Sequence, residues 1–140
     1  MPYKPIRACL YGVLIWLVGF IWGSVVFMTP ALKSVRPIPY VSTNPAISFP
    51  ILIVWIPIAH LLARRYLRSA NNKSEQGLEL GIVFALINAL LDLVFLVMLL
   101  RAGFGYFVSL TVWLGYLLLL IVPWMTGRFL QKRERSADTS

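Results

Sequence analysis

One acidic side chain, Asp92, stands inside a long apolar stretch of this 140-residue sequence. A helical rise places it about 20 Å from Glu79 and about 13 Å from Arg101, the charges that bound the stretch. A carboxylate at that depth in hydrocarbon costs several kcal/mol unless it is paired, hydrated or protonated. Asn88 lies one turn earlier on the same helical face, and Gly81 and Ala85 continue that face, so we expect it to look into the bundle rather than at lipid. The two residues form the candidate site for a proton, a cation or the cationic part of a ligand.

A structural interpretation of Asp92 stays open beside the functional one. A protonated or fully hydrogen-bonded aspartate can fix how helices pack, and no apolar stretch carries a basic partner for it. The same depth arithmetic places Trp55 and residues 111–113 near Asp92 as candidate hydrogen-bond donors. His60 falls at another depth, close to the membrane surface, where we expect a solvated imidazole rather than a proton relay.

The other reactive side chains form no catalytic or metal-binding pattern. No G-x-G-x-x-G, P-loop, H-E-x-x-H or C-x-x-C motif occurs. A hydrolase or transferase needs a nucleophile beside a base, or clustered carboxylates around a metal. The single His, the single Cys and Asp92 fall at different depths. We therefore predict no enzyme activity, no metal site and no cofactor.

Four stretches without charge are long enough to carry these residues through a bilayer, which takes about 20 apolar residues per helix. A hydrophobic fraction of 59% and a charged fraction of 13% exclude a soluble globular domain. No alternating pattern typical of a barrel strand appears, so helix is expected. The prediction is an all-α, polytopic membrane protein: one domain, residues 1–140, forming a four-transmembrane-helix bundle with spans at about 8–30, 46–63, 80–100 and 103–126.

The soluble segments are short and differ in charge. We expect an outer loop at 33–45, a basic inner loop at 64–79 and a disordered polar tail at 128–140. Ten Lys and Arg residues fall on the inner side and three on the outer side, namely Lys33, Arg36 and Arg101. The positive-inside rule then places both termini in the cytoplasm.

Anionic lipids of the inner leaflet are the partners that this charge distribution predicts. The net charge of +8 does not indicate nucleic acid, because the basic residues lie only between and beyond the apolar stretches. Tyr106 and other aromatic residues near span ends are typical of an interfacial belt. The expected lipid contacts are Arg64, Arg65, Arg68, Arg128, Lys132 and Arg133.

One face of the first span is expected to pack closely against another helix. Its members, spaced by four and seven residues, are Gly12, Trp16, Gly19 and Gly23. Gly19 and Gly23 form a GxxxG step, and Gly81 and Ala85 repeat the small-residue spacing in the third span. We expect these two faces to meet inside one monomer. The alternative is that the first face dimerises the protein.

Two stretches, Tyr11-Gly-Val-Leu-Ile-Trp16 and Glu75-Gln-Gly-Leu-Glu-Leu-Gly81 running on to Asn88 and Asp92, resemble an uncharacterised family of small four-span prokaryotic integral membrane proteins. The resemblance covers spans one and three. It implies the same four-helix topology and a place in the prokaryotic cytoplasmic (inner) membrane, and it assigns no activity.

Two functions remain open from the sequence. The first is a non-enzymatic accessory or assembly subunit that binds lipids or partners, as a homo-oligomer or in a larger membrane complex. The alternative is a small oligomeric channel or a proton- or cation-coupled transporter that uses Asp92. The scarcity of polar residues within the spans favours the first, because a hydrated pathway needs several of them.

Overall fold

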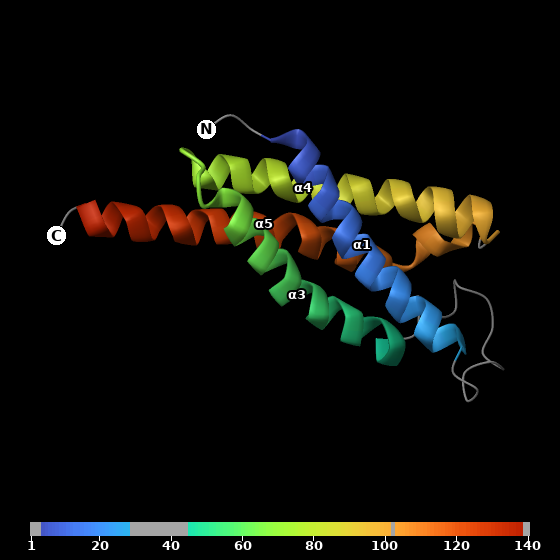
Figure 1. Ribbon diagram of the computed structural model, residues 1–140. Coiled ribbons are helices and arrows are strands. Elements are labelled where there is room, and N and C mark those ends of the chain that lie inside the picture. Colours follow the sequence, from blue (N-terminus) through green and yellow to red (C-terminus); the bar gives the residue numbers. More distant parts are fainter. Residues whose placement is uncertain (1–3, 29–44, 102, 139–140) are drawn as a thin grey trace.

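The computed structural model describes residues 4–28, 45–101 and 103–138 (Figure 1). Four helices in these ranges are long and apolar enough to cross a membrane. They are α1 (Pro5–Met28), α3 (Pro45–Leu67), α4 (Lys73–Leu91) with its π-helical continuation η2 (Asp92–Leu99), and α5 (Leu110–Asp138), which follows the short 3-10 segment η3 (Phe104–Val108). These residues contain no strand. The predicted all-α four-helix bundle is confirmed.

Helices α4 and α5 lie side by side and make the most extensive helix contact, with α1 and α3 crossing them (Figure 1). Helix α1 packs mainly on α4, and α3 packs mainly on α5. The fully buried side chains between the helices include Ile15, Leu80, Phe84 and Leu119. The apolar side chains on the outward faces remain exposed, as expected of helices that meet lipid.

Glycines set how closely α4 and α5 approach. A Cβ added at Gly77 would lie 2.7 Å from the carbonyl oxygen of Pro123, and one at Gly81 would overlap the carbonyl of Leu120. On α5, a Cβ at Gly127 would overlap the carbonyl of Lys73. The two backbones therefore meet directly, at the separation where Cα–H groups face carbonyl oxygens.

The expected pairing of small-residue faces between spans one and three is wrong for Gly81, which faces α5. On α1, Gly12 lies against Ile87 of α4, whereas Gly19 lies against the Trp55 ring of α3. Gly23 has no atom within 4 Å of its added Cβ. The first-span face is therefore occupied within the monomer at Gly12 and Gly19. Ala85 is half-buried.

Two predicted boundaries are also wrong, both at the end of the bundle that carries the termini. Helix α3 continues through Leu67 and α4 already begins at Lys73, so most of the expected inner loop 64–79 is helical. Helix α5 extends to Asp138, although residues 128–140 were expected to form a disordered tail. The expectation placed helix ends where charges begin. Lys, Arg, Glu and Gln favour helix in water, so the helices continue beyond the apolar stretch.

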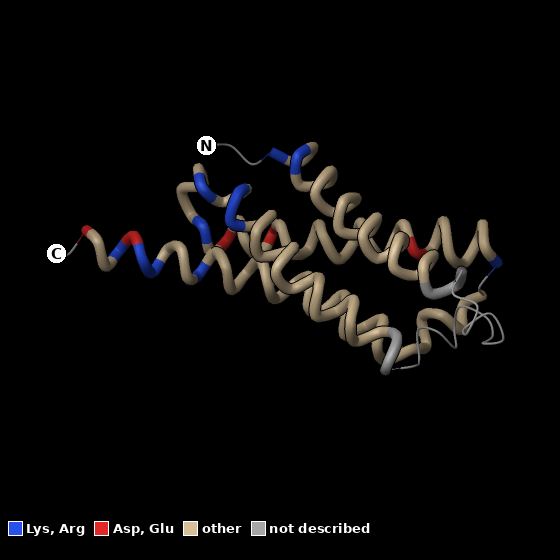
Figure 2. Tube along the Cα trace, turned by 60° about the horizontal axis from the view of Figure 1, so that its bottom comes forward, with Lys and Arg blue, Asp and Glu red and all other residues tan. Residues whose placement is uncertain are grey.

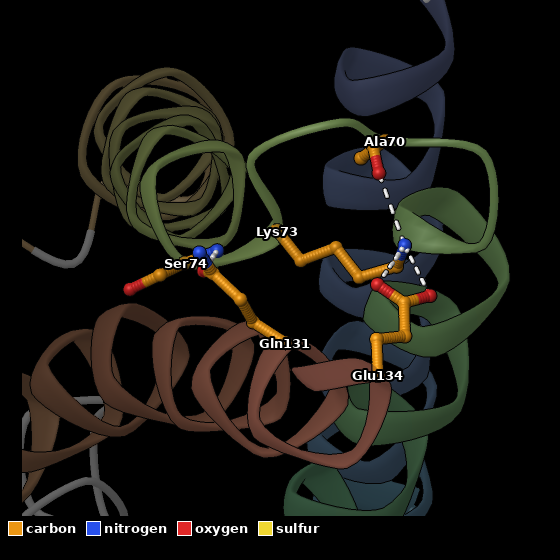
Figure 3. A network of polar contacts seen from close by, with 5 residues as sticks. All are labelled: Ala70, Lys73, Ser74, Gln131 and Glu134. Carbon is orange, nitrogen blue, oxygen red and sulfur yellow. Dashed lines mark hydrogen bonds and ion pairs between the residues drawn. The ribbon is translucent and has the colours of Figure 1, made fainter. Parts of the chain in front are cut away.

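A polar clamp fastens the extension of α5 to the start of α4 (Figure 3). The ammonium of Lys73 lies 2.7 Å from Glu134 Oε1 and donates to the Ala70 carbonyl at 3.0 Å. The backbone N–H of Ser74 donates to Gln131 Oε1 at 3.0 Å. These contacts explain why the end of α5 stays ordered and helical. The predicted outer loop 33–45, by contrast, lies outside the described residues except for Pro45.

Lys and Arg gather at one end of the bundle. Figure 2 shows them where both ends of the chain lie, together with the turn between α3 and α4. Arg101, just beyond η2, is the exception among the described basic residues. The arrangement in space therefore repeats the asymmetry of the sequence, with charge concentrated at one end.

Candidate functional site

Asp92 is buried, with 6% of its surface exposed, at the first residue of η2. The indole N–H of Trp16 donates to its Oδ1 at 2.9 Å. The hydroxyls of Tyr106 and Tyr116 donate to its Oδ2 at 3.1 and 2.5 Å. One carboxylate thus joins four segments of the chain, namely α1, η2, η3 and α5. The prediction that Asp92 and Asn88 face the bundle interior is confirmed, since Asn88 is only 1% exposed.

Helices α1 and α4 cross while running in the same direction from the terminal end of the bundle (Figure 1), and they make two successive polar contacts. Asn88 donates from Nδ2 to the Gly12 carbonyl at 3.2 Å and to the carbonyl of Phe84 in its own helix at 2.8 Å. One turn later on both helices, Trp16 bonds Asp92. The separation in sequence is 76 residues in both interhelical contacts. The register of the pair is therefore fixed by hydrogen bonds, one turn apart.

Aromatic rings border this pair of contacts. Trp16 stacks on Phe20 with ring centroids 5.0 Å apart and tilts against Phe95 at 4.9 Å. Phe95 belongs to η2, so the π-helical segment contributes to the same wall. Apolar rings keep the local dielectric low, which strengthens each hydrogen bond to the carboxylate and raises the cost of leaving one unmade.

The chain reverses direction after η2 and returns a tyrosine to the interior. Arg101 (φ 53°) and Gly103 (φ 75°) both adopt left-handed backbone conformations. Such a conformation suits glycine and disfavours arginine. The reversal lets η3 fold back so that Tyr106 reaches Asp92.

The donors predicted from depth are not the ones that bond Asp92. Trp113 donates instead to the Phe107 carbonyl at 2.6 Å, and the hydroxyls of Thr111 and Ser109 lie 2.8 Å apart. The Trp55 ring fits between Gly19 and Gly115, and its buried indole N–H has no partner among the described residues.

The observed helix ends account for one of the two tyrosines that the depths expected from the sequence did not select. Tyr116 lies six residues into α5 and Asp92 lies seven residues before the end of η2, so both are at similar depth from the same end of the bundle. Tyr106 had been placed in an interfacial belt, because no pattern indicates that the segment after Arg101 folds back. Both tyrosines instead contribute to the site.

His60 links α3 to α5 rather than to Asp92. Its Nδ1 lies 2.8 Å from Thr126 Oγ1, and that hydroxyl donates its only hydrogen to the Val122 carbonyl at 2.8 Å. The hydrogen between the first two atoms must therefore be on His60 Nδ1, an assignment made from the network. His60 as a whole is an exposed residue. No hydrogen bond between His60 and Asp92 occurs in the described chain.

The basic residues expected to contact lipid are all exposed. Arg128 lies over the Trp124 ring, with its guanidinium carbon 5.0 Å from the ring centroid. This contact holds one positive charge beside an indole, a side chain that favours the membrane surface. In the described ranges, no group of three or more His, Cys, Asp or Glu residues could hold a metal ion.

The resemblance of residues 11–16 and 75–92 to small four-span membrane proteins remains a prediction. Residues from both stretches meet at the site, where Gly12 and Trp16 contact Asn88 and Asp92. Comparisons with family models, with curated proteins and with solved structures found no match for this chain.

Proposed function

We propose that this chain is a non-enzymatic integral membrane protein that serves as an accessory or assembly subunit and binds lipids or protein partners. The observation that carries the proposal is that the Asp92 carboxylate is hydrogen-bonded within its own chain. Its carboxylate accepts hydrogen bonds from Trp16, Tyr106 and Tyr116. These bonds hold α1, the segment after η2 and α5 together. Such a role is structural, since the polar group is bonded within its own chain.

The charge distribution supports an orientation with both termini in the cytoplasm. The basic residues at the terminal end of the bundle would face the anionic inner leaflet, where each Lys or Arg near the surface contributes about 1 kcal/mol. The resemblance to prokaryotic four-span proteins supports the cytoplasmic (inner) membrane as the location. A fluorescent protein fused after Ser140 should fluoresce in cells, because it folds on the cytoplasmic side. Fluorescence only from an N-terminally truncated, three-span version would contradict this orientation.

A flux measurement tests the proposal most directly. Wild-type protein and Asp92→Asn are reconstituted into vesicles, and proton and cation fluxes are recorded with internal dyes. We expect neither protein to raise the flux above that of empty vesicles. A wild-type flux that Asp92→Asn abolishes would overturn the accessory-subunit proposal. A native mass measurement in detergent then distinguishes a homo-oligomer from a subunit that needs other chains.

The second candidate function is a small oligomeric channel or proton- or cation-coupled transporter centred on Asp92. One observation favours it: the buried Oδ1 atom of Asn88, one turn from Asp92, has no hydrogen-bond partner in the described chain. The π-helical segment that starts at Asp92 is a second unusual feature at this position, because π-helical turns often accompany functional sites. The flux measurement above decides between the two functions.

A further inference from the structure

The negative charge of Asp92 has no positive charge beside it in the described residues. Lys73 forms an ion pair with Glu134, far along α4 from Asp92. The three side chains that bond Asp92 are two phenols and an indole, which are neutral donors. Neutral donors spread the charge of a buried carboxylate without cancelling it, and an uncompensated ion within hydrocarbon is costly.

Two side-chain oxygens, on Asn88 of α4 and on Asp92 at the start of η2, keep lone pairs that accept no hydrogen bond from the described residues. Asp92 Oδ2 accepts two hydrogen bonds and Oδ1 accepts one, so Oδ1 keeps a free lone pair. One turn earlier, Asn88 Oδ1 accepts no hydrogen bond at all. Spacing of four residues places these two side chains on the same helical face, and both contact α1, at Gly12 and Trp16.

The orientation of the Asn88 amide is determined by its surroundings. Its Nδ2 contacts two carbonyl oxygens, those of Gly12 and Phe84. Turning the amide over would place oxygen against both carbonyls, which cannot donate. The unpartnered atom is therefore the oxygen, which is an acceptor. It belongs to a residue with only 1% of its surface exposed.

We infer that Asn88 Oδ1 and Asp92 Oδ1, held against Gly12 and Trp16 of α1, form a binding site for one monovalent cation. A single positive charge neutralises Asp92, and carboxylate and amide oxygens are the ligands that hard cations prefer. Two sources supply this chemistry, namely a sodium ion held by both oxygens or a proton held on the carboxylate. This inference goes beyond the accessory role, because a tightly held counterion needs no flux.

The side chains that face Asp92 are uncharged, so only a bound cation changes the net charge of the site. Helix α1 presents Trp16, which does not titrate, while η3 and α5 present Tyr106 and Tyr116. Helix α3 contributes the ring of Trp55, which lies against Gly19 and Gly115 and is also uncharged. A dependence of stability on sodium or on pH that is lost with Asp92 is therefore a property of this site.

The test measures the melting temperature of purified protein in neutral detergent. Sodium chloride is compared with choline chloride at equal ionic strength, each at alkaline and at mildly acidic pH. The variants are Asp92→Asn, Asn88→Ala and, as a matched control, Asn72→Ala, whose exposed amide bonds Glu75 outside the bundle interior. A cation bound only by the folded protein should raise the wild-type melting temperature by roughly 4 °C or more.

Each result decides the inference. If sodium raises the melting temperature at alkaline pH in wild type and Asn72→Ala, but less in Asn88→Ala and not in Asp92→Asn, the site holds sodium. If acidification raises the melting temperature in both salts and only Asp92→Asn loses this rise, the site holds a proton. Equal responses of wild type and Asp92→Asn to both variables would overturn the inference. If Asp92→Asn fails to fold, the comparison of Asn88→Ala with Asn72→Ala and sodium-23 relaxation of the wild type test the sodium site. A carboxylic-acid infrared band of the wild type that persists at alkaline pH then shows a bound proton, and the absence of both signals overturns the inference.

Discussion

Helix α4 meets its two main neighbours by opposite means. Toward α5 it presents glycines, so that Gly77 and Gly81 lie against main-chain carbonyls. Toward α1 this helix and its continuation η2 present short polar side chains, Asn88 and Asp92, which contact a carbonyl and an indole. The first contact depends on the absence of side chains, and the second depends on particular atoms at the ends of side chains.

The difference shows which property each contact supplies. A glycine contact gains dispersion energy over a close approach but accepts no larger residue. A polar contact in an apolar interior specifies register, because a slip by one turn would break both the Gly12–Asn88 and the Trp16–Asp92 bonds and leave their buried groups unpaired. The glycines therefore allow a short distance between α4 and α5, while the polar contacts determine the register of α1 against α4.

The largest effect is expected where the backbones touch. Gly81→Ala places a methyl group into the Leu120 carbonyl, which must force the helices apart, and should cost about 3 kcal/mol of stability. Thermal unfolding in detergent measures this loss. Gly23→Ala is the control, because its added methyl meets nothing within 4 Å. It should be neutral or stabilise by up to about 1 kcal/mol through helix propensity. Similar melting temperatures for the two variants would refute a tight α4–α5 contact.

An intermediate effect is expected from removing one donor to Asp92. Tyr116→Phe keeps the ring but leaves the buried carboxylate with one hydrogen bond fewer, at a cost of about 2 kcal/mol. Tyr11→Phe is the matched control. The Tyr11 hydroxyl accepts from Arg7 Nε in a partly buried contact near the chain end, and its loss should cost about 0.5 kcal/mol. If Tyr116→Phe proved as mild as the control, Asp92 would not be holding α5 in place.

The smallest effect is expected at the polar clamp. The side chain of Glu134 is 59% exposed, so its ion pair with Lys73 contributes about 1 kcal/mol at most. Lys73→Met should leave the bundle intact and loosen only the final turns of α5. Faster amide hydrogen exchange in residues 131–138 would show this, and added salt should reduce the difference. Glu75→Gln is the control, since Glu75 bonds Asn72 and not α5. Unchanged exchange in Lys73→Met would mean that Gln131 and helix propensity alone hold the extension.

The sequence predicted the number and kind of elements because hydrocarbon imposes a length and a composition on each crossing helix. It also predicted that Asn88 and Asp92 face inward, since a turn of helix sets their relative direction. Helix ends were harder to predict. The charges at Glu79 and Arg128 mark where an apolar stretch stops, and helices α4 and α5 extend beyond them.

The partners of Asp92 could be predicted only in part. Depth selected Trp55 and Trp113, but depth does not determine the direction of a side chain around its helix. Tyr106 depends on a chain reversal at Arg101 and Gly103, and no periodic pattern records such a reversal. Gly81 was assigned to α1 because small-residue spacing identifies a close contact without identifying the neighbour.

The bonds to Asp92 also imply an order of assembly during synthesis. Trp16 precedes Asp92 by 76 residues, whereas Tyr106 and Tyr116 follow it by 14 and 24. Because a chain emerges from its N-terminus, α1 is present to receive the carboxylate before either phenol exists. A nascent chain that ends before Tyr106 holds Asp92 with one donor in place of three. A full-length chain with both Tyr106→Phe and Tyr116→Phe keeps α5 but holds Asp92 with Trp16 alone, so it should be degraded faster in cells than the wild type. A pulse-chase comparison of the two chains measures how much the late-made tyrosines protect the protein.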